Sequence, residues 1–587
     1  MIPATRRDVM PSTLHAIAAL ASRLLVGYTF VRHGDLVVAD PPLLVTLLLA
    51  LGGICLLAGV GTRLCALLLA GHMILLLATA ERMRLVAATV PGGDFGLLEV
   101  APLVLLMLLF WLAVRGAGRF ALDQALQRRL AARAATVRAA DAVEPTRIVI
   151  LGGGFGGLYA GMRLERIFAD DPHVEVTVVN QDNFLLFTPM LHEVAASDLD
   201  LTHVVSATRK LLQHARFVNG EVRGIDLARR TVTIAHGEER REHRLRYDHL
   251  VVGLGSVTNF YGLPGLAEGA FTMRTLGDAI ALRNRLIASM EEASVVDDPE
   301  QRARLLTFVV AGGGFAGVET IAAINDFARE TLRFYPRLSP ADLRVVLVHS
   351  GDRILPELSG SLGRYAQEKL TARGVEVRLQ ARVQALNARG VALADGTELP
   401  TRTLVWTAGT APHPLLATLP CAKERGRIVV EATMAVPQHP GIWALGDCAA
   451  VPDLVRGGSC PPTAQHATRQ GTTLADNLAA AMRGRPLRPF RFRMLGQLAA
   501  LGRRSGVAQV FGMRFSGFVA WWLWRSIYLS KLPGFERKVR VAVDWSLDLL
   551  FTKDLVKCPT DRGPAAPVAG EPSVAADGVL QTLQRQT

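Results

Sequence analysis

Two glycine-rich turns are the features of this 587-residue sequence that point most directly to chemistry. The first turn follows the apolar run at 147–151 and contains Gly152, Gly154, Gly156 and Gly157. A helix-forming stretch and a second apolar run at 174–179 come next. Between a strand and a helix, the spacing G-x-G-x-x-G lets backbone N–H groups approach a pyrophosphate at the helix N-terminus. The first turn therefore predicts a dinucleotide-binding site.

A second turn of the same kind follows the apolar run at 306–311 and contains Gly312, Gly314 and Gly317. Two dinucleotide folds in one chain indicate that two nucleotides meet, typically a flavin and a nicotinamide. The strand after each turn usually ends in an acid that binds ribose hydroxyls, but here Asn180 and His349 occupy those ends. The amide of Asn180 can still bond a ribose. An acid at this position would repel the 2′-phosphate of NADPH. Because His349 stands there instead, NADPH is disfavoured less than a turn of this kind normally implies.

A carboxylate follows the apolar run at 441–445, where the sequence reads Gly446-Asp447. A strand that ends in this way places the carboxylate where it can hydrogen-bond a polyol. In flavoproteins with two dinucleotide folds, this aspartate typically holds the ribityl chain of FAD, and the alternative is that Asp447 only caps a turn. None of the six cysteines forms C-x-x-C, so neither a metal site nor a dithiol centre is expected.

The elements that hold these sites follow an apolar N-terminal region. Hydrophobic residues make up 50% of the chain and charged residues only 20%, and four apolar runs of about 17–20 residues lie at 14–31, 43–60, 64–80 and 95–114. Each approaches the roughly 20 residues that a helix needs to cross a bilayer, so four transmembrane helices are expected. A soluble helical bundle is the alternative. Most arginines flanking the runs, among them Arg6, Arg63 and Arg115, fall on one side, which should be cytoplasmic.

Aromatic and basic residues gather near the C-terminus. The aromatic residues are Trp521, Trp522, Trp524, Tyr528 and Trp545, and the basic ones include Arg525, Lys531 and Arg537. This mixture suits a helix that lies in a lipid headgroup layer, and a buried helix at a domain or dimer interface is the alternative. The net charge of +13 fits an anionic membrane surface or nucleic acid, but the basic linker at 119–144 lacks the interleaved aromatics of a nucleic-acid site.

Two family resemblances emerge from these motifs. GTR at 61–63 and GAGRFALD at 116–123 are similar to the four-helix DoxX family of membrane proteins. The rest resembles the type II NADH dehydrogenases. The matching segments are RIVILGGGFGGLYAGMRL from 147, NFLLFTPMLHEVA at 183–195, FVVAGGGFAGVET at 308–320, RILPEL at 353–358, GVEV at 374–377, GIWALGDCAAVPD at 441–453, PPTAQHATRQG at 461–471 and the segment at 517–535.

The second resemblance implies an enzyme that passes hydride from NADH to FAD and then two electrons to a membrane quinone, without pumping protons. It implies that FAD is held by the first turn with Asn180, Gly446 and Asp447, and the nicotinamide nucleotide by the second turn with His349. Glu319 lies near the junction of donor and flavin, and Ala464, Gln465 and Arg469 border the quinone end.

The chain departs from the family at four positions. Asn180 and His349 replace acids, Arg469 replaces a glutamine, and Leu495 replaces a lysine that often precedes Gly496. A guanidinium at 469 would stabilise negative charge on the quinone oxygen. The alternative is that Arg469 pairs with a neighbouring carboxylate and compensates for the missing lysine.

The expected fold is a tandem Rossmann (α/β) flavoprotein behind an all-α four-helix transmembrane bundle. The expected domains are a DoxX-like domain at 1–118, a basic linker at 119–144, a FAD-binding domain at 145–300 and 401–485, a NAD(P)H-binding domain at 301–400, a membrane-associating region at 486–558 and a disordered tail at 559–587. The expected location is the bacterial inner membrane, as a multi-pass protein whose catalytic domain faces the cytoplasm. A homodimer and an unidentified redox partner of the DoxX-like domain are further expectations.

Two other functions remain open at this point. One is an NAD(P)H-dependent flavoprotein reductase whose acceptor is a partner protein or another non-quinone carrier. The other is a non-enzymatic flavin-bound sensor or assembly factor, which the four departures motivate.

Overall fold

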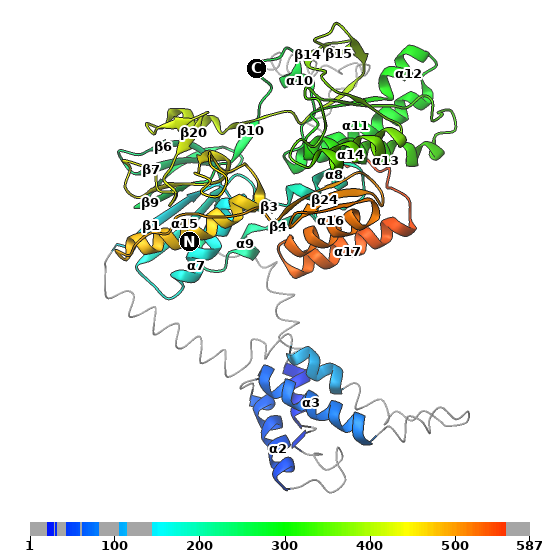
Figure 1. The fold of residues 1–587 in the computed structure, drawn as a ribbon. Coiled ribbons are helices and arrows are strands. Elements are labelled where there is room, and N and C mark those ends of the chain that lie inside the picture. Colours follow the sequence, from blue (N-terminus) through cyan, green and yellow to red (C-terminus); the bar gives the residue numbers. More distant parts are fainter. Residues whose placement is uncertain are drawn as a thin grey trace, which may run out of the picture. The chain divides into compact units, whose positions relative to one another are not determined.

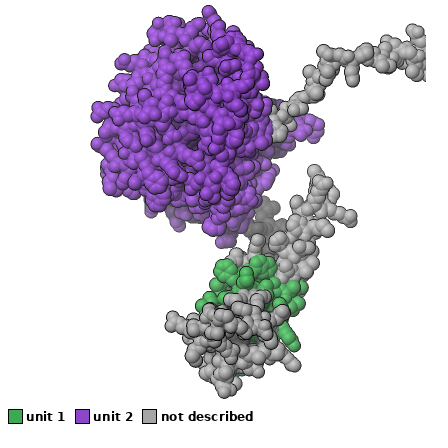
Figure 2. All heavy atoms as spheres, turned by 90° about the vertical axis from the view of Figure 1, so that its right-hand side faces the viewer, with its two compact units in different colours: residues 1–143 green, residues 144–587 purple. Residues whose placement is uncertain are grey.

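The computed structural model describes residues 20–28, 30–31, 43–58, 62–80, 105–113 and 144–558. The chain divides into two compact units, residues 1–143 and 144–587 (Figure 2). The motif at 116–123, almost all of the expected linker at 119–144, the expected tail at 559–587 and most of the arginines that flank the apolar runs lie outside the described residues.

Unit 1 is helical within each of the four apolar runs of the sequence. The helices with defined bounds are α2 (Leu43–Ala58) and α3 (Thr62–Ala80), and residues 20–28 and 105–113 are also helical. Among the described residues, no helix combines the length and the apolar character that a membrane crossing requires.

The four helical segments of unit 1 share one apolar core. Its fully buried side chains include Val26, Phe30, Leu56, Ala66, Leu109 and Leu112. The backbones of the first segment and α2 approach each other closely, because a Cβ on Gly27 would lie 2.8 Å from the carbonyl oxygen of Gly53. Glycine is therefore required where these two segments cross.

The first parallel sheet of unit 2 carries the first glycine-rich turn (Figure 1). Its strand order is β21-β9-β1-β2-β5, with bounds β21 Ile442–Ala444, β9 His249–Val252, β1 Thr146–Leu151, β2 Val174–Asn180 and β5 Arg216–Asn219. Helices α7 (Phe155–Ile167) and α15 (Ala464–Met482) pack side by side along it (Figure 1). Because parallel strands end at one edge of a sheet, the turn after β1 and Asp447 after β21 share that edge.

A second parallel sheet carries the second turn. Its strand order is β13-β12-β11-β17, with bounds β13 Val375–Arg378, β12 Arg344–Val348, β11 Thr307–Ala311 and β17 Thr403–Trp406. Helix α13 (Phe315–Thr331) follows the turn, and α14 (Gly360–Ala372) connects β12 to β13. β17 pairs with β11 in this sheet, whereas the sequence-based boundary at 400/401 assigns its residues to the FAD-binding domain. The short apolar run TLVW predicts a strand, but nothing in its own residues indicates which of the two sheets this strand joins.

Smaller elements complete unit 2. Antiparallel sheets are formed by β6 (Glu221–Asp226), β7 (Thr231–His236) and β8 (Arg241–Arg246), by β14 (Val383–Leu386), β15 (Gly390–Leu393) and β16 (Glu398–Pro400), by β3 (Phe184–Leu186) and β4 (Val205–Ala207), and by β10 (Ser256–Thr258) and β18 (Thr410–Pro412). β19 (Lys423–Glu424), β20 (Arg427–Val429) and β22 (Ala449–Ala450) form another small sheet. Further helices are α8 (Leu191–Ala195), α9 (Thr208–Leu211), α10 (Leu266–Gly269), α11 (Leu276–Val295), α12 (Pro299–Leu305) and the short η1 (Thr188–Met190), η2 (Leu332–Phe334), η3 (Pro414–Thr418) and η4 (Gly446–Cys448).

The C-terminal part of unit 2 is an antiparallel sheet with two helices (Figure 1). It consists of β23 (Gly496–Ala500), β24 (Gly506–Val510), β25 (Met513–Ser516), α16 (Gly517–Lys531) and α17 (Phe535–Leu550). Trp521, Trp524 and Trp545 are buried, so their assignment to a membrane surface is wrong. The indoles of Trp524 and Trp545 instead pack into the core that α16 and α17 share with α13, and the indole of Trp521 faces the guanidinium of Arg525.

Candidate active site

The first glycine-rich turn combines three glycines required by packing or backbone conformation with one that faces outward. A Cβ on Gly157 would lie 2.0 Å from the carbonyl oxygen of Gly152, and Gly152 itself has φ +99°. A Cβ on Gly156 would meet the side chain of Leu445, so this glycine serves helix packing. Gly154 caps the N-terminus of α7, and a Cβ there would meet no protein atom within 4 Å. This outward side of a helix N-terminus suits a pyrophosphate.

Asn180 stabilises this turn from the end of β2. Its Oδ1 accepts a hydrogen bond from the N–H of Gly153 at 2.8 Å, and its Nδ2 donates to the carbonyl oxygen of Asp182 at 2.8 Å. The amide therefore orients the loop that a ribose would approach. This contact was not evident from the sequence, where Asn180 is only a departure from the usual acid.

The second turn repeats the arrangement with a different side chain. Gly314 caps α13, and the atom nearest to a Cβ there would be Oε1 of Glu357 at 3.9 Å. The N–H of Gly313 donates to Nδ1 of His349 at 3.0 Å. Burial lowers the pKa of His349, which favours the neutral ring that this acceptor role requires. Asn180 and His349 thus make equivalent contacts in the two nucleotide-binding halves.

Asp447 lies on the edge of the first sheet that carries the turn after β1. Its Oδ2 accepts a hydrogen bond from Oγ of Ser256 at 2.6 Å, and Arg274 donates to that same Oγ at 3.0 Å. The N–H of Gly446 donates to Oε1 of Gln470 at 2.8 Å. These contacts fix the carboxylate beside the turn, as binding of a polyol requires. Ser256, Arg274 and Gln470 were missed because no spacing in the sequence links them to Asp447.

The N-terminal part of α15 holds the three residues expected at the quinone end. Ala464 begins the helix, and Nε2 of Gln465 donates to the carbonyl oxygen of Gly496 at 2.8 Å. The guanidinium of Arg469 lies 4.2 Å from the ring centroid of Phe492 and donates to the carbonyl oxygen of Gln465 at 3.0 Å. Within the part of the chain that the structure describes, Arg469 forms no ion pair, so the alternative of a neighbouring carboxylate is not supported.

Glu319 is a buried carboxylic acid on α13. Its Oε1 accepts hydrogen bonds from Nε1 of Trp524 at 2.8 Å and from the N–H of Ala500 at 3.1 Å. Its Oε2 lies 3.8 Å from Nδ1 of His192. Burial raises the pKa of Glu319 to about 8. The group is therefore mostly protonated at neutral pH and can donate a proton.

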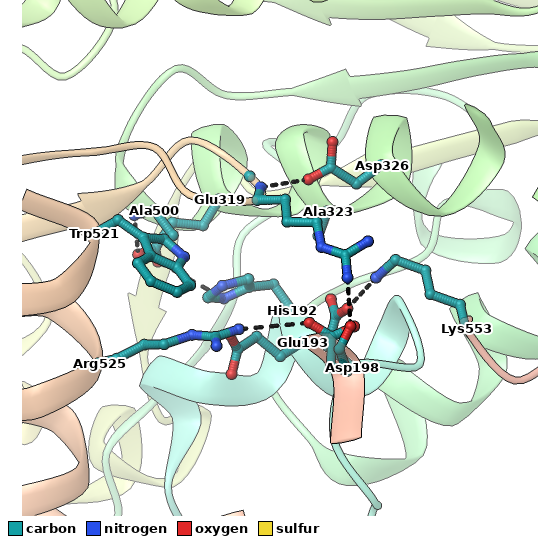
Figure 3. A pocket seen from close by; sticks show the side chains of 13 residues that line it. His192, Glu193, Asp198, Glu319, Ala323, Asp326, Ala500, Trp521, Arg525 and Lys553 are labelled. Carbon is teal, nitrogen blue, oxygen red and sulfur yellow. Dashed lines mark hydrogen bonds and ion pairs between the residues drawn. The ribbon is translucent and has the colours of Figure 1, made fainter. Parts of the chain in front are cut away.

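A cavity of about 30 Å³ adjoins Glu319 (Figure 3). Arg525 and Lys553 reach it from opposite sides, and His192 and Glu193 project from α8 between them (Figure 3). Its lining residues are His192, Glu193, Asp198, Glu319, Ala323, Asp326, Ala500, Gly502, Arg503, Trp521, Arg525, Asp548 and Lys553.

Burial changes the acid–base properties of these lining groups. Burial raises the pKa of Glu193 to about 7 and that of Asp198 to about 6. It lowers the pKa of His192 to about 3, with help from the cation of Lys553. Carboxyl groups that titrate close to neutral pH mark candidate functional sites.

Sequence reasoning identified only Glu319 in this cluster. His192 and Glu193 lie in the segment at 183–195 but were noted only as part of a family pattern. Arg525 was expected at a membrane surface, whereas its guanidinium lies 4.3 Å from the ring centroid of Trp521 and 4.8 Å from that of Trp545. The contributing segments are far apart in sequence, which explains why no local signal predicts the cluster.

Family models match most of unit 2. The model described as pyridine nucleotide-disulphide oxidoreductase matches residues 146–471, and the NDH2 C-terminal domain matches residues 494–554. A relative described as probable NADH dehydrogenase, from Dictyostelium discoideum, is 31% identical over 423 residues, which are 70% of this chain and 91% of the relative. The type II NADH:quinone oxidoreductase Ndh of Mycobacterium tuberculosis is 32% identical over 427 residues, which are 69% of this chain and 89% of the relative.

Solved structures show the same fold. NDH2 from Plasmodium falciparum in complex with NADH superposes with a TM-score of 0.65 at 18% identity, covering 70% of this chain and 100% of that chain. The sulfide:quinone oxidoreductase of Aquifex aeolicus superposes with a TM-score of 0.53 at 16% identity, covering 69% and 94%. At these identities the likeness concerns the fold alone.

Proposed function

This chain belongs to the type II NADH dehydrogenase family, and we propose that it is an FAD-dependent enzyme that oxidises NADH and reduces a quinone. The main support is the pair of glycine-rich turns, each with an outward-facing glycine at a helix N-terminus, on two parallel sheets. The same reaction is named in the descriptions of two relatives, both type II NADH:quinone oxidoreductases.

Residues of the first sheet hold FAD in this proposal. Gly152, Gly154 and Gly157 form the turn for the pyrophosphate. Gly156 allows α7 to pack closely against the side chain of Leu445. Asn180 orients the turn, and Gly446 and Asp447 bind the ribityl chain. The redox chemistry, hydride acceptance and two-electron release, is supplied by FAD when it is bound.

Residues of the second sheet bind the nicotinamide nucleotide. Gly312, Gly314 and Gly317 form its turn, and His349 orients that turn where the family usually has an acid. A neutral ring at this place does not repel a 2′-phosphate. NADH is the primary donor in this proposal, and NADPH is accepted as well.

Glu319 serves the junction of donor and flavin in this proposal, and α15 serves the acceptor end. Glu319 holds a proton in the apolar surroundings of Trp524. Ala464, Gln465 and Arg469 border the quinone in this proposal, and the fixed positive charge of Arg469 stabilises negative charge on the quinone oxygen. Stacking on Phe492 keeps the guanidinium in place without neutralising it.

Membrane association of unit 2 is supported by an exposed apolar row on its C-terminal helices. Along α17 the exposed members follow a helical spacing, and they are Phe535, Val539, Val543, Leu547 and Leu550. Phe518, Val519 and Trp522 add exposed apolar surface on α16. Basic residues such as Arg537 and Lys538 accompany the row, as in helices that lie in a headgroup layer.

Unit 1 is a DoxX-like four-helix membrane domain in this proposal. Its described helices expose large apolar side chains, among them Leu47, Leu51, Leu67, Leu68 and Phe110, in addition to their apolar core. A protein that is apolar on its outer surface is adapted to lipid. The proposed location is the bacterial inner membrane with unit 2 on the cytoplasmic side. A homodimer and a redox partner of unit 1 belong to the same proposal.

A pair of matched glycine variants tests the function. Gly154 and Gly314 both have extended backbones, and a Cβ at either meets no protein atom closer than 3.9 Å. Alanine therefore fits both positions. We expect Gly154→Ala to lose the yellow colour of bound FAD, while Gly314→Ala stays yellow and requires more NADH for anaerobic bleaching of the flavin band in stopped-flow mixing.

Reoxidation by a short-chain quinone completes the test. Bleached wild-type enzyme should regain its flavin band when quinone is added, and should not do so with soluble protein carriers. Full FAD content in Gly154→Ala, or a bleached flavin that quinone fails to reoxidise, would refute the proposal.

A further inference from the structure

The two strands that lead from one parallel sheet of unit 2 to the other pair with each other. β10 follows β9 of the first sheet and leads toward the second sheet (Figure 1), and β18 follows β17 of the second sheet. Their antiparallel pairing joins Ser256 to Pro412 and Thr258 to Thr410. The residues that come directly after β10 therefore lie against the loop at 407–409, which comes directly after β17.

This loop at 407–409 borders the second glycine-rich turn. Oγ1 of Thr407 donates a hydrogen bond to the carbonyl oxygen of Ala311 at 2.9 Å. A Cβ on Gly312 would lie 2.5 Å from this Oγ1, and a Cβ on Gly317 would lie 2.7 Å from it. The loop and the second turn are therefore in direct contact.

The loop lies on the side of the turn where the nicotinamide half of a dinucleotide binds. In the strand order β13-β12-β11-β17, the turn after β11 has β12 on one side and β17 on the other. His349 directly follows β12, at the position where an acid usually binds the adenosine ribose. A dinucleotide that crosses the end of this sheet with its adenosine half at β12 has its nicotinamide half at β17.

Tyr261 stands over the loop at this place. A Cβ on Gly409 would lie 2.3 Å from Oη of Tyr261, so only glycine fits beneath this hydroxyl group. The phenol ring meets the indole of Trp406 edge-on, with the ring centroids 6.5 Å apart. The indole is itself fixed, because its Nε1 donates to the carbonyl oxygen of Asn259 at 2.9 Å. Tyr261 is nevertheless 62% exposed, so a large part of its surface remains open to a ligand.

The backbone of Tyr261 adopts a conformation that is costly for a bulky residue. Its φ is +53°, in the left-handed region that favours glycine. Asn259 stabilises this conformation, because its Oδ1 accepts a hydrogen bond from the N–H of Tyr261 at 2.8 Å. Residues held in such conformations by their surroundings concentrate at ligand-binding sites.

The same short segment also reaches the flavin side. Ser256 begins β10, and its Oγ donates to Oδ2 of Asp447 at 2.6 Å. Asp447 is the carboxylate assigned above to the ribityl chain of FAD. Tyr261 is only five positions further along the chain, so one segment connects the proposed flavin contact with the loop beside the second turn.

We propose that Tyr261 binds the nicotinamide half of the donor, and that its hydroxyl group forms a hydrogen bond with the ribose that carries the nicotinamide ring. This inference rests on the function proposed above, in which the second turn binds that donor. A phenolic hydroxyl group can both donate and accept a hydrogen bond, which matches the hydroxyl groups of a ribose. Among the described residues, none forms a hydrogen bond with Oη of Tyr261, so this group is available to a ligand.

The test compares Tyr261→Phe and Tyr261→Ala with the control Tyr365→Phe in full-length, FAD-loaded enzyme. The control tyrosine has similar surroundings, because a Cβ on Gly517 would lie 3.4 Å from Oη of Tyr365 and Gly517 also has a positive φ. Tyr365 lies on α14, however, and faces the start of α16.

Three ligands locate the contact by isothermal titration calorimetry of the oxidised enzyme. ADP contains the adenosine half and the pyrophosphate but lacks the second ribose. ADP-ribose adds that ribose, and NAD⁺ adds the nicotinamide ring as well. Anaerobic stopped-flow mixing with NADH then measures how the rate of flavin bleaching depends on the NADH concentration.

For Tyr261→Phe we expect the dissociation constants of ADP-ribose and NAD⁺ to rise about fivefold, which is the ordinary effect of one lost hydrogen bond. The dissociation constant of ADP should stay unchanged. The NADH concentration that gives half of the limiting bleaching rate should rise by the same factor. Tyr261→Ala should weaken both ribose-containing ligands at least as much, and Tyr365→Phe should match the wild type with every ligand.

Three results would overturn the contact with the ribose. Equal weakening of ADP would show that the substitution distorts the turn. Unchanged binding of all three ligands would show that Tyr261 only packs on Gly409. Weaker binding of NAD⁺ with unchanged binding of ADP-ribose would place the contact at the nicotinamide ring. Failure of NADH to bleach the flavin of the wild type would instead refute the proposed function.

Discussion

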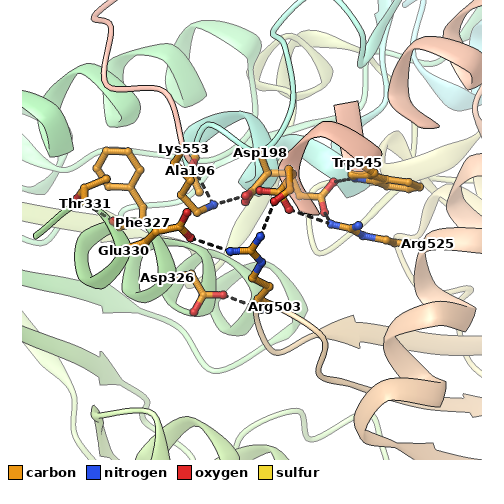
Figure 4. A network of polar contacts seen from close by, with 12 residues as sticks. Ala196, Asp198, Asp326, Phe327, Glu330, Thr331, Arg503, Arg525, Trp545 and Lys553 are labelled. Carbon is orange, nitrogen blue, oxygen red and sulfur yellow. Dashed lines mark hydrogen bonds and ion pairs between the residues drawn. The ribbon is translucent and has the colours of Figure 1, made fainter. Parts of the chain in front are cut away.

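Replacement of Lys553 by methionine tests whether the buried network holds the C-terminal segment onto unit 2. The Lys553 side chain is only 2% exposed; its Nζ forms an ion pair with Asp198 and donates to the carbonyl oxygen of Ala196 at 3.1 Å (Figure 4). Methionine preserves most of the side-chain volume. It leaves the carboxylate of Asp198 without its cation at a site that is 16% exposed.

The expected cost follows from that buried charge. Removal of one partner of a buried ion pair typically destabilises a protein by about 3–5 kcal/mol. If residues 144–558 unfold as one cooperative unit, the melting temperature at pH 8 should fall by about 3–6 °C. The matched control is Lys557→Met, because Lys557 is exposed and its change should leave the melting temperature within about 1 °C.

The effect should depend on pH with a definite sign. Burial raises the pKa of Asp198 to about 6, although the charge of Lys553 opposes the shift. Since this folded-state pKa exceeds the unfolded value of 3.8, the stability that Asp198 contributes is present at acidic pH and is lost as the pH rises through about 6. Without Lys553 the pKa of Asp198 rises further, so the difference between variant and wild type should be small at pH 5 and full at pH 8.

Differential scanning calorimetry of the FAD-loaded protein at both pH values provides the measurement. In an Asp198→Asn background, Lys553→Met should cost less, because no carboxylate is left unpaired. An equal loss of stability at pH 5 and pH 8 would refute the reasoning, since it would show that Lys553 acts through packing alone.

Two further predictions concern the donor and acceptor ends. Arg469→Gln should leave anaerobic flavin reduction by NADH unchanged and slow reoxidation by quinone about tenfold, since one fixed cation near the developing charge is lost; equal slowing of both half-reactions, seen by stopped-flow absorbance, would contradict its placement at the quinone. His349→Asp can still accept the hydrogen bond from Gly313 but adds a carboxylate, so the ratio of kcat/KM for NADPH to that for NADH should fall about tenfold or more; an unchanged ratio in steady-state assays would show that the 2′-phosphate binds elsewhere.

Local patterns in the sequence determined the two nucleotide-binding turns. The apolar run at 147–151 became β1, Gly152 took the positive φ that glycine allows, and α7 began directly after Gly154. The same local order produced β11, the second turn and α13. Such features are encoded within about twenty consecutive residues, because strand, turn and helix each follow from neighbouring side chains.

Only the tertiary structure decided the contacts between distant segments. Asn180 and His349 stand out in the sequence as missing acids, yet each accepts a hydrogen bond from the middle glycine of its turn. In the sequence, the tryptophans of α16 and α17 are compatible both with a helix at a membrane surface and with a helix buried in a protein core. The folded chain buries three of them, with Trp524 and Trp545 in the core shared with α13, and leaves Trp522 exposed.

The acidic cavity shows why sequence alone cannot resolve such a site. Asp198 and Lys553 are 355 positions apart, and Glu193 and Trp545 are 352 positions apart. The raised pKa of Glu319 comes from burial, which depends on how α13 packs against β23 and α16. The residue types in the sequence show which groups can titrate. The dielectric surroundings and the partners that set the pKa values of these groups exist only in the folded chain.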